Sequence, residues 1–555
     1  MSDQSDQFNA AMREKGVIAA PPGGIVDAQG EPAGRPSAPV LELPRDGWGL
    51  DDFAREAGMI TKTNGVFRRD NVPVTVDHEK GRIETMDADR FRTYLADLAF
   101  LFKWKSNGKD RPPERVKVTM TKDTAAGTLK SDQFLEQQRE LARVNVIRQP
   151  VIRRNGAMVL LPEVYDEETG VLTLPSDVVI REDMPIEEAV AHLRDLYREF
   201  MFPDWVDKPI AERMDSVYLS RQVSLMLGFY GSLLVPHTEN RQGGFFNANR
   251  ERSGKGLLAK MVIVPVMGRM KTRTKPKSDE EFLKTLDTTA LCASSYLVLD
   301  DLPPGNMKSQ DLNSFMTTAW WSGRYMGGQR EFEVPLQTIV YMTGHNVTLT
   351  GDLAGRVLEV KLEMQEADVQ RHRIERVISE TWLAKTEVRS DICSALWALM
   401  RHWDKMGRPK STATKPGFEA WCELFGGIVE AAGLGDPFVM PETDESPDPE
   451  FDDMRALIGH LMSDVTDKMV EVTFAQLVAT CQHLNCFSWM VEGKWEKDKD
   501  TGEKTFETSP KCNSRMGDLF SKKYGGARFH LADGRVVKFG QRGKNRHRRY
   551  VLVVE

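Results

Sequence analysis

The sequence predicts a multidomain protein of mixed α/β and α+β class, and three observations support this. The chain has 555 residues, whereas single hydrophobic cores usually stop growing at roughly 250 to 300 residues, so several folded units are expected. Hydrophobic residues make up 40% and charged residues 28% of the chain, which is ordinary for globular domains. Between residues 207 and 362, apolar and β-branched runs alternate with helical patterns and glycine-rich turns, as in an α/β sheet domain.

Breaks in composition divide the chain into segments. The N-terminal residues, with PPGG at 21–24, predict a mobile tail, and PETDESPDPEFDD is too acidic and proline-rich to fold alone, so it predicts a linker. Three helical patterns followed by a hairpin with an Asp-Gly turn predict a C-terminal winged helix. The expected parts are a tail (1–45), an N-terminal α+β accessory domain (46–205), an α/β core (206–365), a helical region (366–440), the linker (441–453) and the winged helix (454–555).

Hydrophobic periodicity predicts individual helices and strands in the accessory domain and in the C-terminal region. In the accessory domain, helical patterns cover 88–102, 133–144 and 186–200, and strand-like runs cover 116–120, 158–161 and 171–174. In the C-terminal region, helices are expected over 454–469, 474–485 and 512–524.

Several protein classes are disfavoured. No stretch offers the ~20 uninterrupted apolar residues of a membrane span, and the N-terminus lacks a secretory signal, so we expect a cytoplasmic protein without membrane contact. Six scattered cysteines do not form a disulfide framework. Cys481, His483 and Cys486 are close enough to consider zinc, but their spacing favours structural thiols.

Charge is unevenly distributed. The net charge of −7 argues against a general polyanion binder, yet the stretch from Arg535 to Arg549 contains no acidic residue. The alternation in RVVKF and RRYVLVV favours folded strands that line a phosphate backbone, and a solvated basic tail is the alternative. The candidate DNA contacts here are Lys522, Lys523, Arg528, Lys538, Arg542, Lys544, Arg546 and Arg548.

The segment FFNANRERSGKGLLAKM predicts a phosphate-binding loop, in which an apolar strand leads through a polar turn into a helix. Backbone N–H groups and the positive helix end stabilise phosphate, and the lysine reaches the outer phosphates. The loop departs from the usual pattern, with Asn249 at the first glycine and Gly256 where a hydroxyl would hold Mg²⁺; an exposed turn is the alternative. The candidate nucleotide-binding residues are Asn249, Ser253, Gly254, Lys255, Gly256 and Leu257.

Two later strands and an arginine complete the predicted site. SSYLVLDDLPPG ends a buried strand in Asp300, suited to organising Mg²⁺ through water, and Asp301, suited to polarising the attacking water; a turn or helix cap is the alternative. TIVYMTGHN places Asn346 after another strand, where its amide could hold that water. Arg356 could stabilise transition-state charge, or form a surface salt bridge. Together these residues predict an ATP site that uses Mg²⁺.

These motifs resemble the AAA+ ATPases related to superfamily 3 helicases, especially helicase or primase-helicase proteins of phages, plasmids and integrated elements. The resemblance covers 151–434, with SGKGLLAK, LVLDDLPPG, WWSGRYMGGQREFEVP and TGHNVTLTGDLAGRVLEVKL. It implies an AAA+ P-loop core in a homo-oligomeric ring, expected to be a hexamer, with Arg356 reaching the neighbouring subunit's nucleotide. The family often has two consecutive arginines there, whereas this chain has Gly355 first. It also tolerates glycine after the loop lysine.

The resemblance also implies that 322–332 forms a hairpin that grips DNA in the ring channel. Arg324 and Arg330 would contact phosphates, and Trp320 and Trp321 would support the hairpin or stack on bases, although at least one tryptophan is expected to be core. No metal-binding acidic motif typical of a primase is found in 46–202, so we predict no primer synthesis and allow for a separate primase or polymerase partner.

The sequence therefore predicts an ATP-dependent DNA helicase or translocase from the replication system of a phage or other mobile element. The alternative is a nucleotide-binding replication initiator or DNA-binding scaffold with weak ATP turnover. A third possibility is a nucleotide-dependent enzyme unrelated to DNA.

Overall fold

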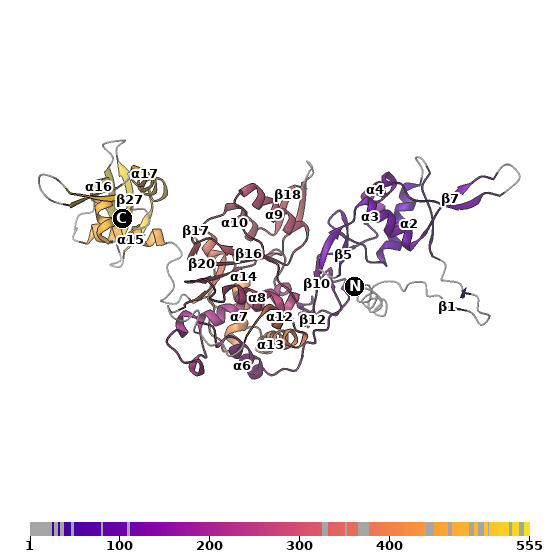
Figure 1. The fold of residues 1–555 in the computed structure, drawn as a ribbon, viewed down its shortest axis with the longest axis horizontal. Helices are drawn as coiled ribbons and strands as arrows, with labels where there is room; N and C mark the ends of the chain where they lie inside the picture. The colour runs from indigo at the N-terminus through magenta and orange to yellow at the C-terminus, as the bar shows by residue number, and fades with distance from the viewer. Residues whose placement is uncertain are drawn as a thin grey trace. The chain divides into compact units, whose positions relative to one another are not determined.

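A computed structural model describes most of the chain. The described residues are 25–26, 32–33, 38–45, 49–78, 81–107, 112–324, 331–349, 352–364, 377–439, 449–463, 469–484, 486–487, 493–497, 504–508, 510–531, 535–542 and 549–554. They form two compact units, 1–441 and 442–555, which are described separately (Figure 1). Among the described residues, no helix combines the length and apolar character needed to cross a bilayer.

Between residues 40 and 140, the described part of the first unit combines four helices with two small sheets. The helices are α2 (Leu50–Lys62), α3 (Ala88–Leu98), α4 (Lys122–Lys130) and α5 (Asp132–Leu135). One sheet has the order β3 (Val40–Glu42), β7 (Phe100–Lys105), β8 (Glu114–Lys117). The other has the order β6 (Arg82–Thr85), β5 (Val72–Asp77), β4 (Phe67–Arg69), β9 (Arg139–Glu140). Phe53, Phe91 and Phe134 lie in the core beneath the helices.

Three predictions in this region are wrong. The expected helix over 133–144 ends after Leu135, because the following residues pair with distant strands as β9 and as β10 (Arg143–Asn145). The helix expected over 88–102 ends at Leu98 and the chain turns into β7. The tail expected over 1–45 is too long, since Val40 pairs with Phe100 and Leu41 is buried. In each case tertiary pairing overrides local propensity.

A short β region leads into the next part of the unit. β10 pairs with β14 (Val171–Thr173), which pairs with β13 (Tyr165–Asp166), and β11 (Pro150–Ile152) pairs with β12 (Met158–Leu160). The expected helix over 186–200 is confirmed as α6 (Ile186–Tyr197), which presents Leu193 to the core.

The centre of the first unit is a parallel sheet. Its order is β16 (Tyr296–Leu302), β20 (Ile339–His345), β15 (Gly243–Ala248), β22 (Val357–Leu362), and every neighbouring pair is parallel. Parallel strands end at the same edge of a sheet, so the residues that follow β15, β16 and β20 are gathered there.

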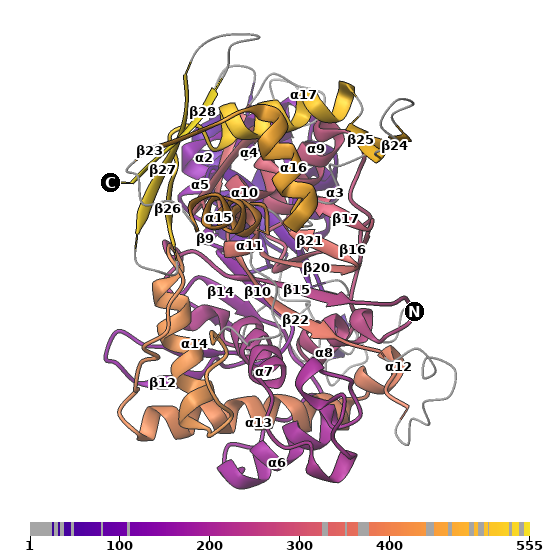
Figure 2. The same ribbon diagram turned by 90° about the vertical axis from the view of Figure 1, so that its left-hand side faces the viewer.

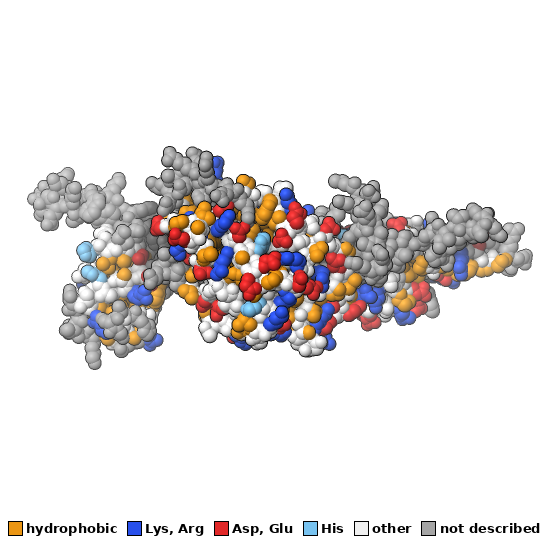
Figure 3. Space-filling model, turned by 90° about the horizontal axis from the view of Figure 1, so that it is seen from below, with side chains coloured by type: hydrophobic (Ala, Val, Ile, Leu, Met, Phe, Trp, Pro, Cys, Tyr) orange, Lys and Arg blue, Asp and Glu red, His pale blue; other side chains and the backbone are white. Residues whose placement is uncertain are grey.

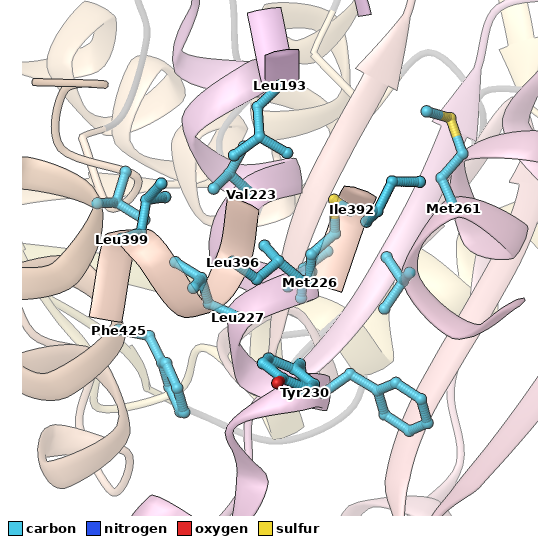
Figure 4. Packing of buried hydrophobic residues seen from close by; sticks show 14 of the residues in the cluster. Leu193, Val223, Met226, Leu227, Tyr230, Met261, Ile392, Leu396, Leu399 and Phe425 are labelled. Carbon is cyan, nitrogen blue, oxygen red and sulfur yellow. The ribbon is translucent and has the colours of Figure 1, made fainter. Parts of the chain in front are cut away.

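Helices cover both faces of this sheet, which explains why its strands are apolar at consecutive positions. Phe245 packs into the core on one face and Phe246 into the core on the other. One face is covered by α7 (Val217–Tyr230), α8 (Lys255–Met267), α13 (Thr386–Lys405) and α14 (Glu419–Ala431), and the other by α9 (Asp279–Leu291) and α10 (Gln310–Met316) (Figures 1 and 2). Figure 4 shows the larger core, where Leu227 of α7 lies near Leu396 of α13.

Helix α8 is apolar around its circumference, as expected of a helix that is buried on all sides.

Three smaller pieces complete the unit around the sheet. β17 (Gly305–Met307) pairs with β21 (Val347–Leu349), β18 (Trp320–Arg324) pairs with β19 (Glu331–Pro335), and α11 (Asp352–Gly355) precedes β22. The short helix α12 (Glu380–Leu383) precedes α13.

The second unit contains α15 (Pro449–Met462), α16 (Phe474–Leu484), α17 (Pro510–Asp518) and a sheet. The sheet order is β23 (Met469–Val472), β28 (Arg549–Val554), β27 (Val536–Arg542), β26 (Arg528–His530), and a separate hairpin joins β24 (Gly493–Lys497) to β25 (Lys504–Thr508). Phe520, Phe539 and Tyr550 lie in its core.

The boundary of the predicted linker is wrong at its C-terminal end. α15 begins at Pro449, inside the expected linker 441–453, because proline suits the first turn of a helix. The same helix ends at Met462, whereas the pattern predicted helix to residue 469; Met469 instead pairs with Val553 in the sheet.

Candidate nucleotide site

The loop between β15 and α8 has the geometry of an anion-binding turn. Gly254 has φ 100°, a left-handed conformation that favours glycine, and Arg252 before it has φ 59°. α8 begins at Lys255 without a side-chain cap, and the N–H groups of Leu257 and Leu258 both donate to the carbonyl of Gly254. The first N–H groups of a helix lack intrahelical acceptors, so those of Lys255 and Gly256 are suited to an anion.

The loop lysine meets the acidic strand. Lys255 Nζ lies 3.6 Å from Asp301 Oδ1, and the Lys255 side chain is only 13% exposed, whereas that of Asp301 is 73% exposed. Asp301 itself has φ 55°, a strained backbone that is common at functional sites. The structure therefore brings together these two residues, which the sequence analysis assigned to one site.

A buried threonine fixes the orientation of the acidic pair. The hydroxyl of Thr343 on β20 donates to Asp300 Oδ1 at 2.6 Å and accepts from the backbone N–H of Asp301 at 2.9 Å. The register of β16 against β20 is irregular between Leu299 and Leu302, where the two aspartates lie. Thr343 was not predicted from the sequence. The feature that could have pointed to it is a hydroxyl residue inside the otherwise apolar run IVYMTG.

Asn346 stands at the same edge of the sheet. It has φ 51°, its N–H donates to the carbonyl of Ala248 at the end of β15, and its side chain is exposed. The preceding residue, His345, lies 3.6 Å from Glu251 of the loop through its Nε2. Lys255, Asp300, Asp301 and Asn346 are thus brought to one edge, as the parallel strands predicted.

The side chains of two predicted loop residues have different surroundings. Asn249 Nδ2 donates to the carbonyl of Met364 and its Oδ1 accepts from the N–H of Met364, so the amide fastens the start of the loop to the end of β22. The Asn249 side chain is therefore hydrogen-bonded to the backbone of Met364. Ser253 Oγ is buried, and within the described part of the chain it has no hydrogen-bond partner.

Gly256 has room for a side chain. A Cβ at Gly256 would meet no atom within 4 Å, whereas one at Gly254 would approach Phe200 at 3.5 Å. Packing therefore does not explain the glycine at 256, and a hydroxyl residue would fit there.

Arg356 lies at the opposite edge of the sheet. The register pairs Gly243 with Val357 and Ala248 with Leu362, so Arg356 precedes the amino end of β22. The loop follows the other end of β15, about 17 Å away at ~3.3 Å per residue. Arg356 Nη2 lies 3.6 Å from Asp352 Oδ2, and its guanidinium is 19% exposed. It is not brought together with Lys255 within one chain.

The predicted DNA contacts of the first unit lie on the β18–β19 hairpin. Arg324 and Glu331 are opposite one another on the two strands; both are exposed, and Arg324 Nε lies 3.7 Å from Glu331 Oε1. Arg330 lies outside the described residues. Trp320 is 46% exposed, whereas Trp321 is buried against Phe315. Trp321 is thus core and Trp320 is available at the surface.

In the second unit, those residues predicted to contact DNA that the structure describes are exposed. Arg528 and Lys538 face one another across β26 and β27. Lys522 pairs with Asp518 at 3.0 Å, Lys523 with Glu450, and Arg542 with Glu471 at 3.5 Å. Lys544, Arg546 and Arg548 lie outside the described residues.

The cysteines of the second unit do not resemble metal ligands. Burial raises the pKa of Cys481 to about 12 and that of Cys486 to about 11. Across the described ranges, no three His, Cys, Asp or Glu side chains form a cluster that could hold a metal ion.

Comparisons with known proteins were made for the whole chain. Among solved structures, the A form apo structure of the NrS-1 C terminal region, CTR(305-718), is similar with a TM-score of 0.35 and 11% sequence identity, covering 82% of this chain and 99% of that chain. No family model matches the sequence. No curated protein matches it either.

Proposed function

We propose that the chain is an ATP-dependent DNA helicase or translocase of a phage or mobile-element replication system, with an AAA+ core of the superfamily 3 type. The observation that carries the proposal is the approach of Lys255 to Asp301, at the edge where β15, β16 and β20 end. Four predicted residues from three separate strands meet there, which is the arrangement that phosphoryl transfer requires.

The residues present fit ATP and Mg²⁺. The uncapped N-terminus of α8 and the Lys255 ammonium would bind the phosphates, while the Asp300 carboxylate, oriented by Thr343, would hold water ligands of Mg²⁺. Bound Mg²⁺ would neutralise charge on the phosphate oxygens. The exposed carboxylate of Asp301 and the amide of Asn346 would orient the attacking water.

Ring formation is proposed from the position of Arg356. Because Arg356 stands at the opposite end of the strands from its own loop, a strand length of about 17 Å at ~3.3 Å per residue, it would act on the nucleotide of a neighbouring copy. Head-to-tail contacts of this kind close into rings. The basic residues of the second unit, proposed to be a winged helix, would hold DNA.

The test is ATP hydrolysis with and without single-stranded DNA, together with strand displacement. Lys255→Ala is expected to lower hydrolysis by at least about 100-fold, because a positioned cation stabilises transition-state charge. Lys260→Ala is the matched control: this lysine is on the same helix but pairs with Glu380 at 3.0 Å. Absence of hydrolysis by the unmodified protein, with DNA and without it, would contradict the proposal.

Gly256 favours a second candidate, a nucleotide-binding replication initiator or scaffold with weak turnover. No hydroxyl is available at this position to bind Mg²⁺, although space exists for one. Tight ATP binding without strand displacement would support this second function.

A further inference from the structure

A basic segment between α8 and α9 lies beside the candidate site. Every second residue from 269 to 277 is basic, and the segment contains no acidic residue. Its members are Arg269, Lys271, Arg273, Lys275 and Lys277, hereafter the basic segment. On the face seen in Figure 3, basic and acidic side chains are interspersed.

The basic segment is attached to the acidic strand through its backbone. Arg273 N–H donates to the carbonyl of Val298, and Asp300 N–H donates to the carbonyl of Arg273, both at 2.9 Å. Arg273 and Leu299 form a parallel bridge at the edge of the sheet. The segment therefore runs alongside β16, immediately before the two aspartates.

The side chains are presented to solvent. Lys271, Arg273 and Lys277 are exposed. Lys275 is half-buried and lies 5.0 Å from the ring centroid of Phe282, which fixes the C-terminal part of the segment on α9.

We propose that the basic segment contacts the phosphate backbone of single-stranded DNA and transmits that contact to Asp300. A run of exposed cations without acidic residues suits a polyanion, and the backbone pairing of Arg273 with β16 holds the middle of the run beside Asp300. Because Arg273 is hydrogen-bonded to Asp300 through the main chain, DNA bound here is linked directly to the candidate ATP site. The inference rests on the proposed function and adds a DNA contact and a route for DNA-stimulated hydrolysis.

The test compares two variants that remove the same number of charges from the full chain. In one, Lys271, Arg273 and Lys277 are replaced by Gln; in the control, the exposed Arg55, Lys122 and Lys130 of α2 and α4 are replaced by Gln. Binding of fluorescent oligothymidylate is measured across salt concentrations. For the first variant we expect the slope of log affinity against log salt to fall by about 2, since each contact to a single strand contributes ~0.7. The ratio of DNA-stimulated to basal hydrolysis should fall towards 1, and the control should match the unmodified protein.

A second measurement does not depend on variants. Acetic anhydride labelling followed by peptide mapping should show that oligothymidylate protects Lys271 and Lys277 but not Lys130. If the unmodified protein binds DNA and hydrolyses ATP but both variants behave alike and the lysines stay reactive, the inference is overturned and the proposed function survives. If the unmodified protein does not bind DNA, both are overturned.

Discussion

Thr343 donates a hydrogen bond from its hydroxyl to Oδ1 of Asp300 at 2.6 Å, across two neighbouring strands of the parallel sheet. The hydroxyl oxygen of Thr343 also accepts a hydrogen bond from the backbone N–H of Asp301 at 2.9 Å. One fully buried side chain therefore holds both the carboxylate and the backbone of the acidic pair. Groups that orient metal-binding carboxylates in this way strongly influence metal affinity.

Replacing Thr343 with Val should keep the packing but remove both hydrogen bonds. We expect ATP turnover to fall by about 10- to 100-fold and the half-saturating Mg²⁺ concentration to rise, because the Asp300 carboxylate loses its orientation. Thr343→Ser retains the hydroxyl and should recover most of the activity. An unchanged Mg²⁺ requirement in the Val variant would show that Thr343 has only a packing role.

The open space at Gly256 makes a gain of function possible. Gly256→Ser should fold normally, because a Cβ there meets no neighbour, and should lower the Mg²⁺ concentration needed for half-maximal turnover by several-fold to about tenfold. Gly256→Ala separates the effect of the added Cβ from that of the hydroxyl. Equal behaviour of the Ser and Ala variants would mean that the missing hydroxyl does not limit the site.

The distance of Arg356 from its own loop predicts complementation between subunits. Lys255→Ala and Arg356→Ala proteins should each be inactive, but an equal mixture should recover up to about a quarter of the activity, because random head-to-tail assembly leaves that share of interfaces with both residues intact. Hydrolysis is measured after the two proteins have been mixed and allowed to exchange subunits. A mixture as inactive as its components, with subunit exchange shown by labelling, would place Arg356 outside the shared site.

The base of the β18–β19 hairpin depends on one buried polar contact. Trp321 Nε1 donates to Asp287 Oδ1 of α9 at 2.8 Å, and Asp287 is 9% exposed. Trp321→Phe should lower the free energy of unfolding by about 1 to 3 kcal/mol, since a buried carboxylate loses its partner. Trp320→Phe, at the exposed neighbouring position, should change it by less than about 0.5 kcal/mol. Denaturant titration followed by circular dichroism measures both; equal effects would show that the hydrogen bond does not stabilise the fold.

The candidate site was predictable from the sequence where local patterns suffice. Lys255 follows a glycine before a helical run, and Asp300, Asp301 and Asn346 follow apolar strands, so strand direction alone implied a common edge. Thr343 was missed because a single hydroxyl in an apolar run carries no periodic signal. The hydrogen bonds of Asn249 to Met364 were missed because Met364 is far away in the sequence.

The basic segment, too, was only partly predictable from the sequence. The alternation of basic and other residues is visible in the sequence. Only the pairing of Arg273 with β16 places the basic segment beside Asp300. The helix expected over 133–144 failed for a related reason, since its residues complete two sheets formed by distant strands.

The sequence by itself determined which residues could carry charge, where several helices and the strands beside the candidate site lie, and which residues stand at the ends of those strands. Only the tertiary structure decided that Thr343 orients Asp300, that Asn249 fastens the loop, and that Arg356 lies at the far edge of the sheet. The physical reason is range: helix periodicity and turn preferences act between near neighbours, whereas these contacts depend on how distant strands pair.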